Sequence, residues 1–263
     1  MKLTGAAFLL FLVASVPVFL LLQSREQIDL FGNIGQLAGL VFAATSFLHA
    51  WDIAKNRVIQ KVAILIAGGM LIWAIGQLMV TYSELLLHRS PYGTVSSIFF
   101  VIGNSMCLTA LIELLRQALK SQNRAVLIRT LQLIFVTALV LTLFLVLGDW
   151  HYLTDADRDP IYKILDLLYP VFDLCMVGLT VVLLRSAYLR NEIGAFKGYA
   201  CFCMAFLAIG FADVIGIDTD FEKMIYRLTD TIYFSAYFLI ALSGHYLART
   251  SRQSTVTEKS LTQ

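Results

Sequence analysis

The chain has little charge and none of the short motifs that mark a soluble enzyme. Only 14% of its 263 residues are charged, whereas a soluble domain typically has about 25%. No HExxH helix, glycine-rich phosphate loop or GxSxG elbow is present, which argues against metal-dependent, nucleotide-dependent and serine-hydrolase chemistry. No strongly basic block is present either, which argues against nucleic acid as a partner. We therefore expect that the protein is not an enzyme.

Cysteine and intramembrane lysine are also scarce. The four cysteines all lie in apolar segments, and Cys201 and Cys203 are two residues apart, so on a helix they point in different directions. We interpret the cysteines as small apolar packing residues, not as disulfides or metal ligands. No lysine lies in the middle of an apolar segment, which excludes a retinal Schiff base of the rhodopsin type. The sequence predicts no cofactor and no metal site.

Long apolar runs are what the sequence has in excess, with 59% apolar residues and a mean hydropathy of +0.77. Each run is close to the roughly 20 residues that cross a bilayer as a helix. We expect an all-α polytopic membrane bundle, in which residues 1–249 form one transmembrane domain and 250–263 a disordered cytoplasmic tail. The first run is interpreted as an uncleaved helix. The eight predicted helices span residues 5–22, 34–50, 62–82, 94–115, 127–148, 162–184, 197–216 and 229–248.

Basic residues predict the orientation of these helices. Most lysines and arginines fall in alternate loops, and most acidic residues fall in the other set. By the positive-inside rule, both termini are cytoplasmic and the loops around residues 149–159 and 218–222 are outside. Glu113 and Arg116, at the cytoplasmic end of one helix, have the spacing of an i,i+3 ion pair. We expect a multi-pass protein of the inner (plasma) membrane.

The segment 162–184 is the most informative, because it carries two carboxylates on either side of a proline. Asp166, Pro170 and Asp173 fall at i, i+4 and i+7, so they share one helical face. An aspartate near a bilayer centre costs about 2.5–3.5 kcal/mol, so this face should not point toward lipid. Pro170 removes a backbone hydrogen bond and predicts a kink, which could be a hinge or a fixed bend.

Further polar residues are predicted to lie in the outer half of the membrane. Asp230, Tyr233 and Tyr237 also share a helical face. One interpretation is an outward-opening pocket for a cation, an amine, a small polar metabolite or protons. The other is that these groups only hold helices together through hydrogen bonds. The candidate ligand-binding residues are Asp173, Asp230, Asp166, Asp213, Tyr233, Tyr237, Tyr169, Asn104 and Gln77.

An internal repeat is a further hypothesis. Residues 61–104 and 197–238 each begin with lysine, and Gly76-Gln77 in the first corresponds to Ala212-Asp213 in the second. Ser96 corresponds to Asp230. A shift of four helices preserves orientation, so the repeat would be parallel, and binding sites often lie at repeat interfaces. The alternative is chance similarity between apolar helices.

Several motifs recur in a family of bacterial membrane proteins. These are Trp73-x-x-Gly76, Tyr169-Pro170-x-x-Asp173, Ala212-Asp213 and Leu228-x-Asp230. Together they resemble the multi-helix N-terminal module found upstream of diguanylate cyclase, phosphodiesterase or histidine kinase domains. Gln77 and Ser96 depart from the resemblance, because such modules often carry aspartate there. We expect this module to act without an output domain of its own after His245.

The resemblance implies a sensor. We therefore expect a stand-alone sensory or accessory membrane protein that signals through a separate protein at the cytoplasmic face. The alternatives are a small ion-coupled transporter and a structural subunit of a membrane complex. The sequence does not specify the oligomeric state.

Overall fold

The computed structural model of the chain is all-α. It describes residues 25–87, 95–120, 124–126, 128–132, 135–136, 160–217 and 224–261. The long helices are α2 (Arg25–Ile53), α3 (Arg57–Leu85), α4 (Val95–Ala118), α7 (Pro160–Leu189), α8 (Ile193–Ile217) and α9 (Met224–Leu261). Among the described residues, 6 helices are long and apolar enough to cross a membrane. The structure thus supports six spans instead of the predicted eight. Of the other two, 5–22 lies outside the described residues, and 127–148 lies mostly outside them.

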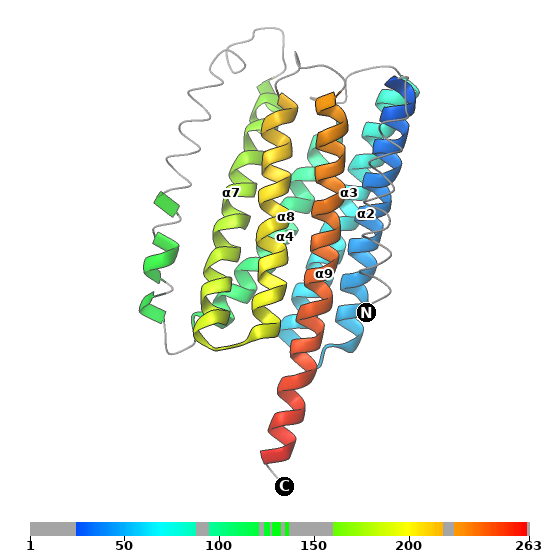
Figure 1. Cartoon of the computed structure of the whole chain (residues 1–263). Coiled ribbons are helices and arrows are strands. Elements are labelled where there is room, and N and C mark those ends of the chain that lie inside the picture. Colours follow the sequence, from blue (N-terminus) through cyan, green and yellow to red (C-terminus); the bar gives the residue numbers. More distant parts are fainter. Residues whose placement is uncertain are drawn as a thin grey trace.

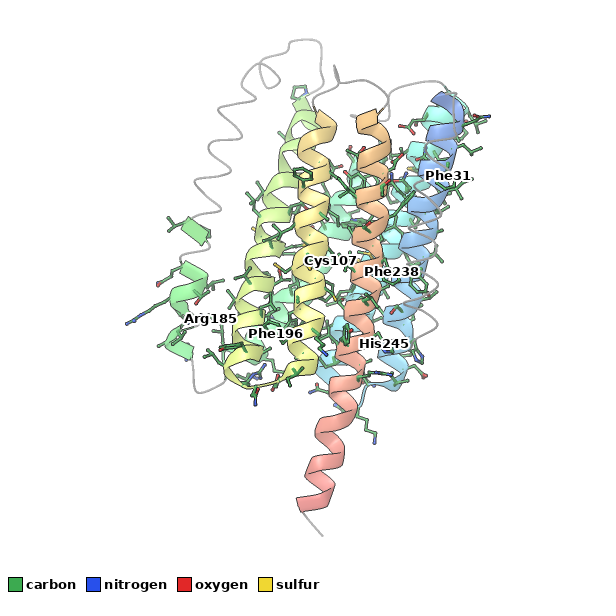
Figure 2. All side chains as sticks on the ribbon, viewed as in Figure 1. Phe31, Cys107, Arg185, Phe196, Phe238 and His245 are labelled. Carbon is green, nitrogen blue, oxygen red and sulfur yellow. The ribbon has the colours of Figure 1, made fainter. Side chains whose placement is uncertain are left out.

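By their mutual contacts the six helices form a closed ring, which Figure 1 shows from the side. Each packs against its neighbour along the chain, and α9 packs back against α2. The helices α2, α4, α7 and α9 begin at the end shown at the top of Figure 1, and α3 and α8 begin at the opposite end. We call the halves of the bundle the upper half and the lower half in this orientation. Figure 2 shows Phe31 near the upper end of α2 and His245 in the lower half.

Two boundaries differ from the sequence-based expectation. Helix α2 begins at Arg25, well before residue 34, because its early polar residues lower the hydropathy without ending the helix. Helix α9 continues to Leu261, so the tail that was predicted to be disordered from residue 250 is helical in the structure and extends beyond the bundle (Figure 1). Extending an existing helix costs less than starting one, because no new nucleus is needed.

Apolar side chains cover both the inside and the outside of the ring. Phe47, Leu111, Phe202 and other large side chains are fully buried between helices. Others point outward and are exposed, as expected for a bundle whose surroundings are lipid instead of water. These exposed side chains include Ile34, Val41, Leu71, Ile75, Ile102, Met204, Leu207 and Phe211.

Glycines allow two pairs of helices to approach closely. A Cβ atom on Gly32 of α2 would lie 2.1 Å from Oδ2 of Asp230 on α9. A Cβ atom on Gly103 of α4 would lie 2.2 Å from the Trp73 ring on α3. Small residues at such contacts are typical of membrane bundles, where close packing takes the place of a hydrophobic driving force.

Two local predictions are confirmed. All four cysteines lie in described residues and are free thiols. Glu113 accepts from Arg116 at 3.0 Å, and Lys61 of α3 joins the same carboxylate at 2.5 Å. This ion-pair group links the lower ends of α3 and α4.

Candidate functional site

Polar side chains gather in the upper half of the ring, where they bridge one helix to the next. Between α2 and α3, Gln77 donates from Nε2 to Oδ1 of Asn33 at 2.5 Å. Asn33 in turn donates from Nδ2 to Oε2 of Glu84 at 2.8 Å. Asn33 and Gln77 are only 5% and 4% exposed, so the bonded groups are shielded from solvent. This contact joins two amides and a carboxylate in series, with each amide donating to the next group.

The contact between α2 and α9 has the same character. Gln36 donates from Nε2 to Oδ1 of Asp230 at 2.7 Å. The Asp230 carboxyl lies directly over Gly32, the close approach described above. A side chain at Gly32 would occupy the space of that carboxyl, so the glycine is what allows Asp230 to reach α2.

A third group joins α9, α8 and α7 through carboxyls. The Tyr233 hydroxyl on α9 donates to Oδ1 of Asp213 on α8. The carboxyl of Asp213 also lies within hydrogen-bonding reach of Asp173 on α7. Gly210 lies one turn below Asp213, and a Cβ atom there would be 3.4 Å from Cβ of Asp173. The two aspartates therefore meet across a closely packed helix pair.

Aromatic rings lie beside this group. The ring centroids of Tyr233 and Tyr237 are 6.2 Å apart, and those of Tyr237 and Trp73 are 6.0 Å apart. Trp73 donates from its indole Nε1 to the backbone oxygen of Phe100 at 3.0 Å. Tyr237 is buried, so it separates the polar groups above from the apolar core below.

Four buried side-chain atoms of the described residues lack a hydrogen-bond partner: Oγ of Ser186 and Nε2 of His245 in the lower half, and two acceptors higher up, one on α4 and one on α7. Tyr169 of α7 donates its hydroxyl to the backbone oxygen of Ser97 on α4 at 3.2 Å, and its ring meets the Phe100 ring edge-on at 6.5 Å. One helical turn below these residues, α4 carries Asn104 and α7 carries Asp173, both 4% exposed. Oδ1 of Asn104 and Oδ2 of Asp173 have no hydrogen-bond partner in the described part of the chain.

The electrostatics of the aspartate pair favour a positive partner. In the described residues, no lysine, arginine or histidine forms an ion pair with Asp173 or Asp213. Two like charges about 4 Å apart repel by about 4 kcal/mol at an effective dielectric constant of about 20. This repulsion is relieved when the pair takes up a proton or a cation.

Most of the predicted site residues do come together. Six of them bridge or line neighbouring helices: Asp173, Asp213, Asp230, Tyr233, Tyr237 and Gln77. Asn104 lies on α4, one turn below the contact with Tyr169. Tyr169 is engaged with the α4 backbone. Asp166 and Pro170 lie on α7, which is helical without a break from Pro160 to Leu189, and their side chains lie outside the described set. The hinge at Pro170 stays a prediction.

Sequence reasoning missed Asn33 and Gln36 of α2. They are three residues apart and so share a face, and Gly32, Gly35 and Gly39 lie beside them. Polar and small residues that alternate in this way on an apolar helix mark a face in contact with another helix. The sequence of α2 therefore contained a signal for this contact face. It was missed because α2 carries none of the motif residues from which the site was predicted.

Neither a pocket at the upper end nor a metal site is shown. A surface hollow of about 500 Å³ lies instead at the lower end, between α3 and α4, next to Val58 and Glu113. Residues 88–94 and 218–223, which join helices at the upper end, lie outside the described ranges. Among the described residues, no group of three or more His, Cys, Asp or Glu side chains could hold a metal ion. The outward-opening pocket stays a prediction.

Comparison with protein-family models, curated proteins and solved structures found no match to this chain. The resemblance to bacterial sensor modules therefore rests only on the motif residues in the sequence. The structure itself establishes the fold: a multi-helix membrane protein with 6 candidate spans.

Proposed function

We propose that the protein is a sensory or accessory protein of the bacterial inner membrane. The polar groups of the upper half form its input site, and a separate protein reads the lower ends of the helices. The observation that carries the proposal is the pair of buried acceptors without donors, on Asp173 and Asn104. They lie in a bundle whose neighbouring polar contacts are paired.

Binding explains these acceptors better than structural support does. A hydrogen bond between membrane helices contributes about 0.6 kcal/mol. A buried polar group without a partner costs about 1–3 kcal/mol. Two such acceptors would therefore outweigh several of the bridges around them. A ligand that donates hydrogen bonds or positive charge would remove this cost.

The lower half of the bundle favours sensing over transport. Phe47, Phe202 and Phe206 stack there, with ring centroids 5.7 and 5.8 Å apart along the series. Leu111 and Leu183 are buried in the same half. A carrier needs polar groups that continue to the other side, and these apolar side chains interrupt such a path. In proteoliposomes we expect no uptake of protons or sodium above that of empty vesicles.

The ring order supports the proposed internal repeat. Turning the ring by half a circle places α2 on α7, α3 on α8 and α4 on α9. This is the correspondence that the sequence comparison suggested for α3–α4 and α8–α9. The polar contacts follow the same rule, because Gln77 of α3 reaches Asn33 of α2, as Asp213 of α8 reaches Asp173 of α7. A parallel repeat would place the input site at a repeat interface.

The charge of the lower end supports a cytoplasmic output. Arg116 and Lys120 lie at the lower end of α4, and the basic residues after α7 lie at the same end. Helices α7, α8 and α9 meet at the aspartates and run to this end, where α9 continues beyond the bundle (Figure 1). A change in their contacts above would alter their packing below.

Spin-label distances test this coupling. Labels would replace exposed Tyr188 on α7 and Lys120 on α4 in a variant without native cysteines, held in lipid nanodiscs. We expect Asp173→Asn to change the distance distribution between the labels. Thr180→Ser, two turns lower on the same helix, is the matched control and should leave the distribution unchanged. If Asp173→Asn, Asp213→Asn and wild type give the same distribution, the sensory proposal fails.

A further inference from the structure

The carboxyls of Asp173 and Asp213 are both hydrogen-bond acceptors when ionised, yet they meet within hydrogen-bonding reach. Two acceptors form a hydrogen bond only if one carries a proton. We propose that the two aspartates share a single proton and that this proton is the ligand of the input site. The protein would then respond to the acidity of the upper, outer side. The signalling part of this inference rests on the proposed function, whereas the shared proton does not.

The geometry favours a proton over a metal ion. Oδ1 of Asp213 already accepts from the Tyr233 hydroxyl, so one of its oxygens is engaged. Asp173 is 4% exposed and packs against α8 beside Gly210. A cation would need several oxygen ligands around it, and no third acidic or histidine side chain joins the pair among the described residues. A proton requires only the two oxygens that already face each other.

The groups around the pair are acidic or neutral. Helix α4 contributes Asn104, which has no charge. Helix α9 contributes Tyr233, whose hydroxyl donates to Asp213, and Tyr237, which lies within electrostatic range of Asp173, Asp213 and Asp230. No cation of the described residues pairs with either aspartate. Two ionised carboxyls in contact would repel each other, and a shared proton removes one of the two charges.

A burial gradient provides a path for the proton from above. Asp213 and Tyr233 are partly exposed, and Asp173 is fully buried behind them. Uptake takes one H⁺ from water on the upper side, forms one O–H bond on a carboxylate and leaves the pair with one negative charge instead of two. The new O–H donates across the α7–α8 contact. Release reverses the step and places two repelling charges between these helices.

Infrared spectroscopy of the protein in nanodiscs tests the shared proton directly. We expect the carbonyl band of one protonated carboxyl per chain at neutral pH in wild type, and its loss in Asp173→Asn. Asp213→Asn should retain a band that disappears at a lower pH, because the like charge has gone and an amide donor has replaced it. Glu113→Gln, which changes a carboxyl at the lower ends of α3 and α4, is the control and should leave the band and its titration unchanged.

Two results would overturn the proposal. One is a wild-type spectrum with no protonated carboxyl across the neutral range. The other is a band that disappears when sodium replaces a large organic cation at constant pH, which would identify a cation site instead. The wild-type titration needs no variant, so the test does not depend on the folding of Asp173→Asn.

Failure of the sensory role looks different from failure of the shared proton. If the band titrates as expected while the distance between labels at Tyr188 and Lys120 stays constant over the same pH range, the proton is shared but not transmitted. If the distance follows pH without any carboxyl band, another group senses acidity. Only the joint titration of band and distance supports both proposals.

Discussion

The α2–α3 and α7–α8 interfaces each join polar side chains, but with different chemistry. In the first, the amide of Gln77 donates to the amide of Asn33, and Asn33 in turn donates to the carboxylate of Glu84. In the second, the carboxyl of Asp213 meets the carboxyl of Asp173, and one oxygen of Asp173 has no donor in the described structure. The first contact is complete without any added group. The second is complete only when something supplies a proton or positive charge, so it is the one that the proposed input would change.

The largest expected effect comes from giving the first interface the chemistry of the second. Asn33→Asp would replace the group that donates to the partly buried Glu84 with a buried carboxylate. An uncompensated buried charge costs about 3–5 kcal/mol, so we expect a loss of this order in the free energy of unfolding at neutral pH. Unfolding in detergent, followed by tryptophan fluorescence, measures it. Asn33→Ala is the control and should cost less, because it adds no charge.

Tyr233→Phe tests the interface in which the two carboxyls meet. It removes the hydroxyl that donates to Asp213 and leaves the ring that stacks on Tyr237. A hydrogen bond to a charged group contributes about 1.5–3 kcal/mol, and we expect this loss of stability when the pair is ionised. The loss should be smaller at a pH where the pair is fully protonated. Unfolding measured at several pH values would show this, and a pH-independent effect would contradict it.

Gly32→Ala tests how far a polar contact depends on backbone approach. The new Cβ atom would lie 2.1 Å from Oδ2 of Asp230, so α2 and α9 must separate or Asp230 must move. Overpacking of this kind costs about 1–3 kcal/mol. Gly210→Ala on α8 is the matched control, since its Cβ atom would meet Asp173 at an ordinary 3.4 Å. Thermal unfolding in detergent should separate the two, and equal midpoints would show that the α2–α9 contact is looser than described.

Asp173→Asn is expected to have the smallest effect on stability and the largest on response. The amide supplies a donor to Asp213 and makes the α7–α8 contact resemble the α2–α3 contact. A satisfied hydrogen bond contributes about 1 kcal/mol, so the variant should be as stable as wild type or slightly more stable at neutral pH. Chemical unfolding measures this. A loss as large as that of Asn33→Asp would mean that Asp173 holds the fold together.

The spans were predictable from the sequence because each depends on a local property. A run of about 20 apolar residues is a bilayer-crossing helix wherever it lies. The ends of the helices were less predictable. Hydropathy identifies the residues that lie in the hydrocarbon core, whereas a helix can continue beyond that core as long as its backbone hydrogen bonds do. Helix α2 therefore begins at Arg25 instead of residue 34, and α9 continues to Leu261.

The site was predictable only in part. Asp173 stood out because a carboxylate inside an apolar helix is costly, and its partner Asp213 carried the same signal. Asn33 was missed, because a single amide is common in membrane helices and its role depends on Gln77 of the neighbouring helix. Which helices become neighbours, and how each is rotated, is a tertiary property that no local pattern contains.

The closed ring also has a consequence for how the chain assembles. The bond between Gln36 and Asp230 joins residues 194 positions apart, so the seam between α2 and α9 forms only after the last helix has been synthesised and inserted. Until then, Gln36 and the glycines beside it on α2 lack the contacts that α9 provides. A polar, small-residue face that waits in this way is a place where two nascent copies could exchange their α9 helices. Insertion of α9 is therefore the step that closes the ring.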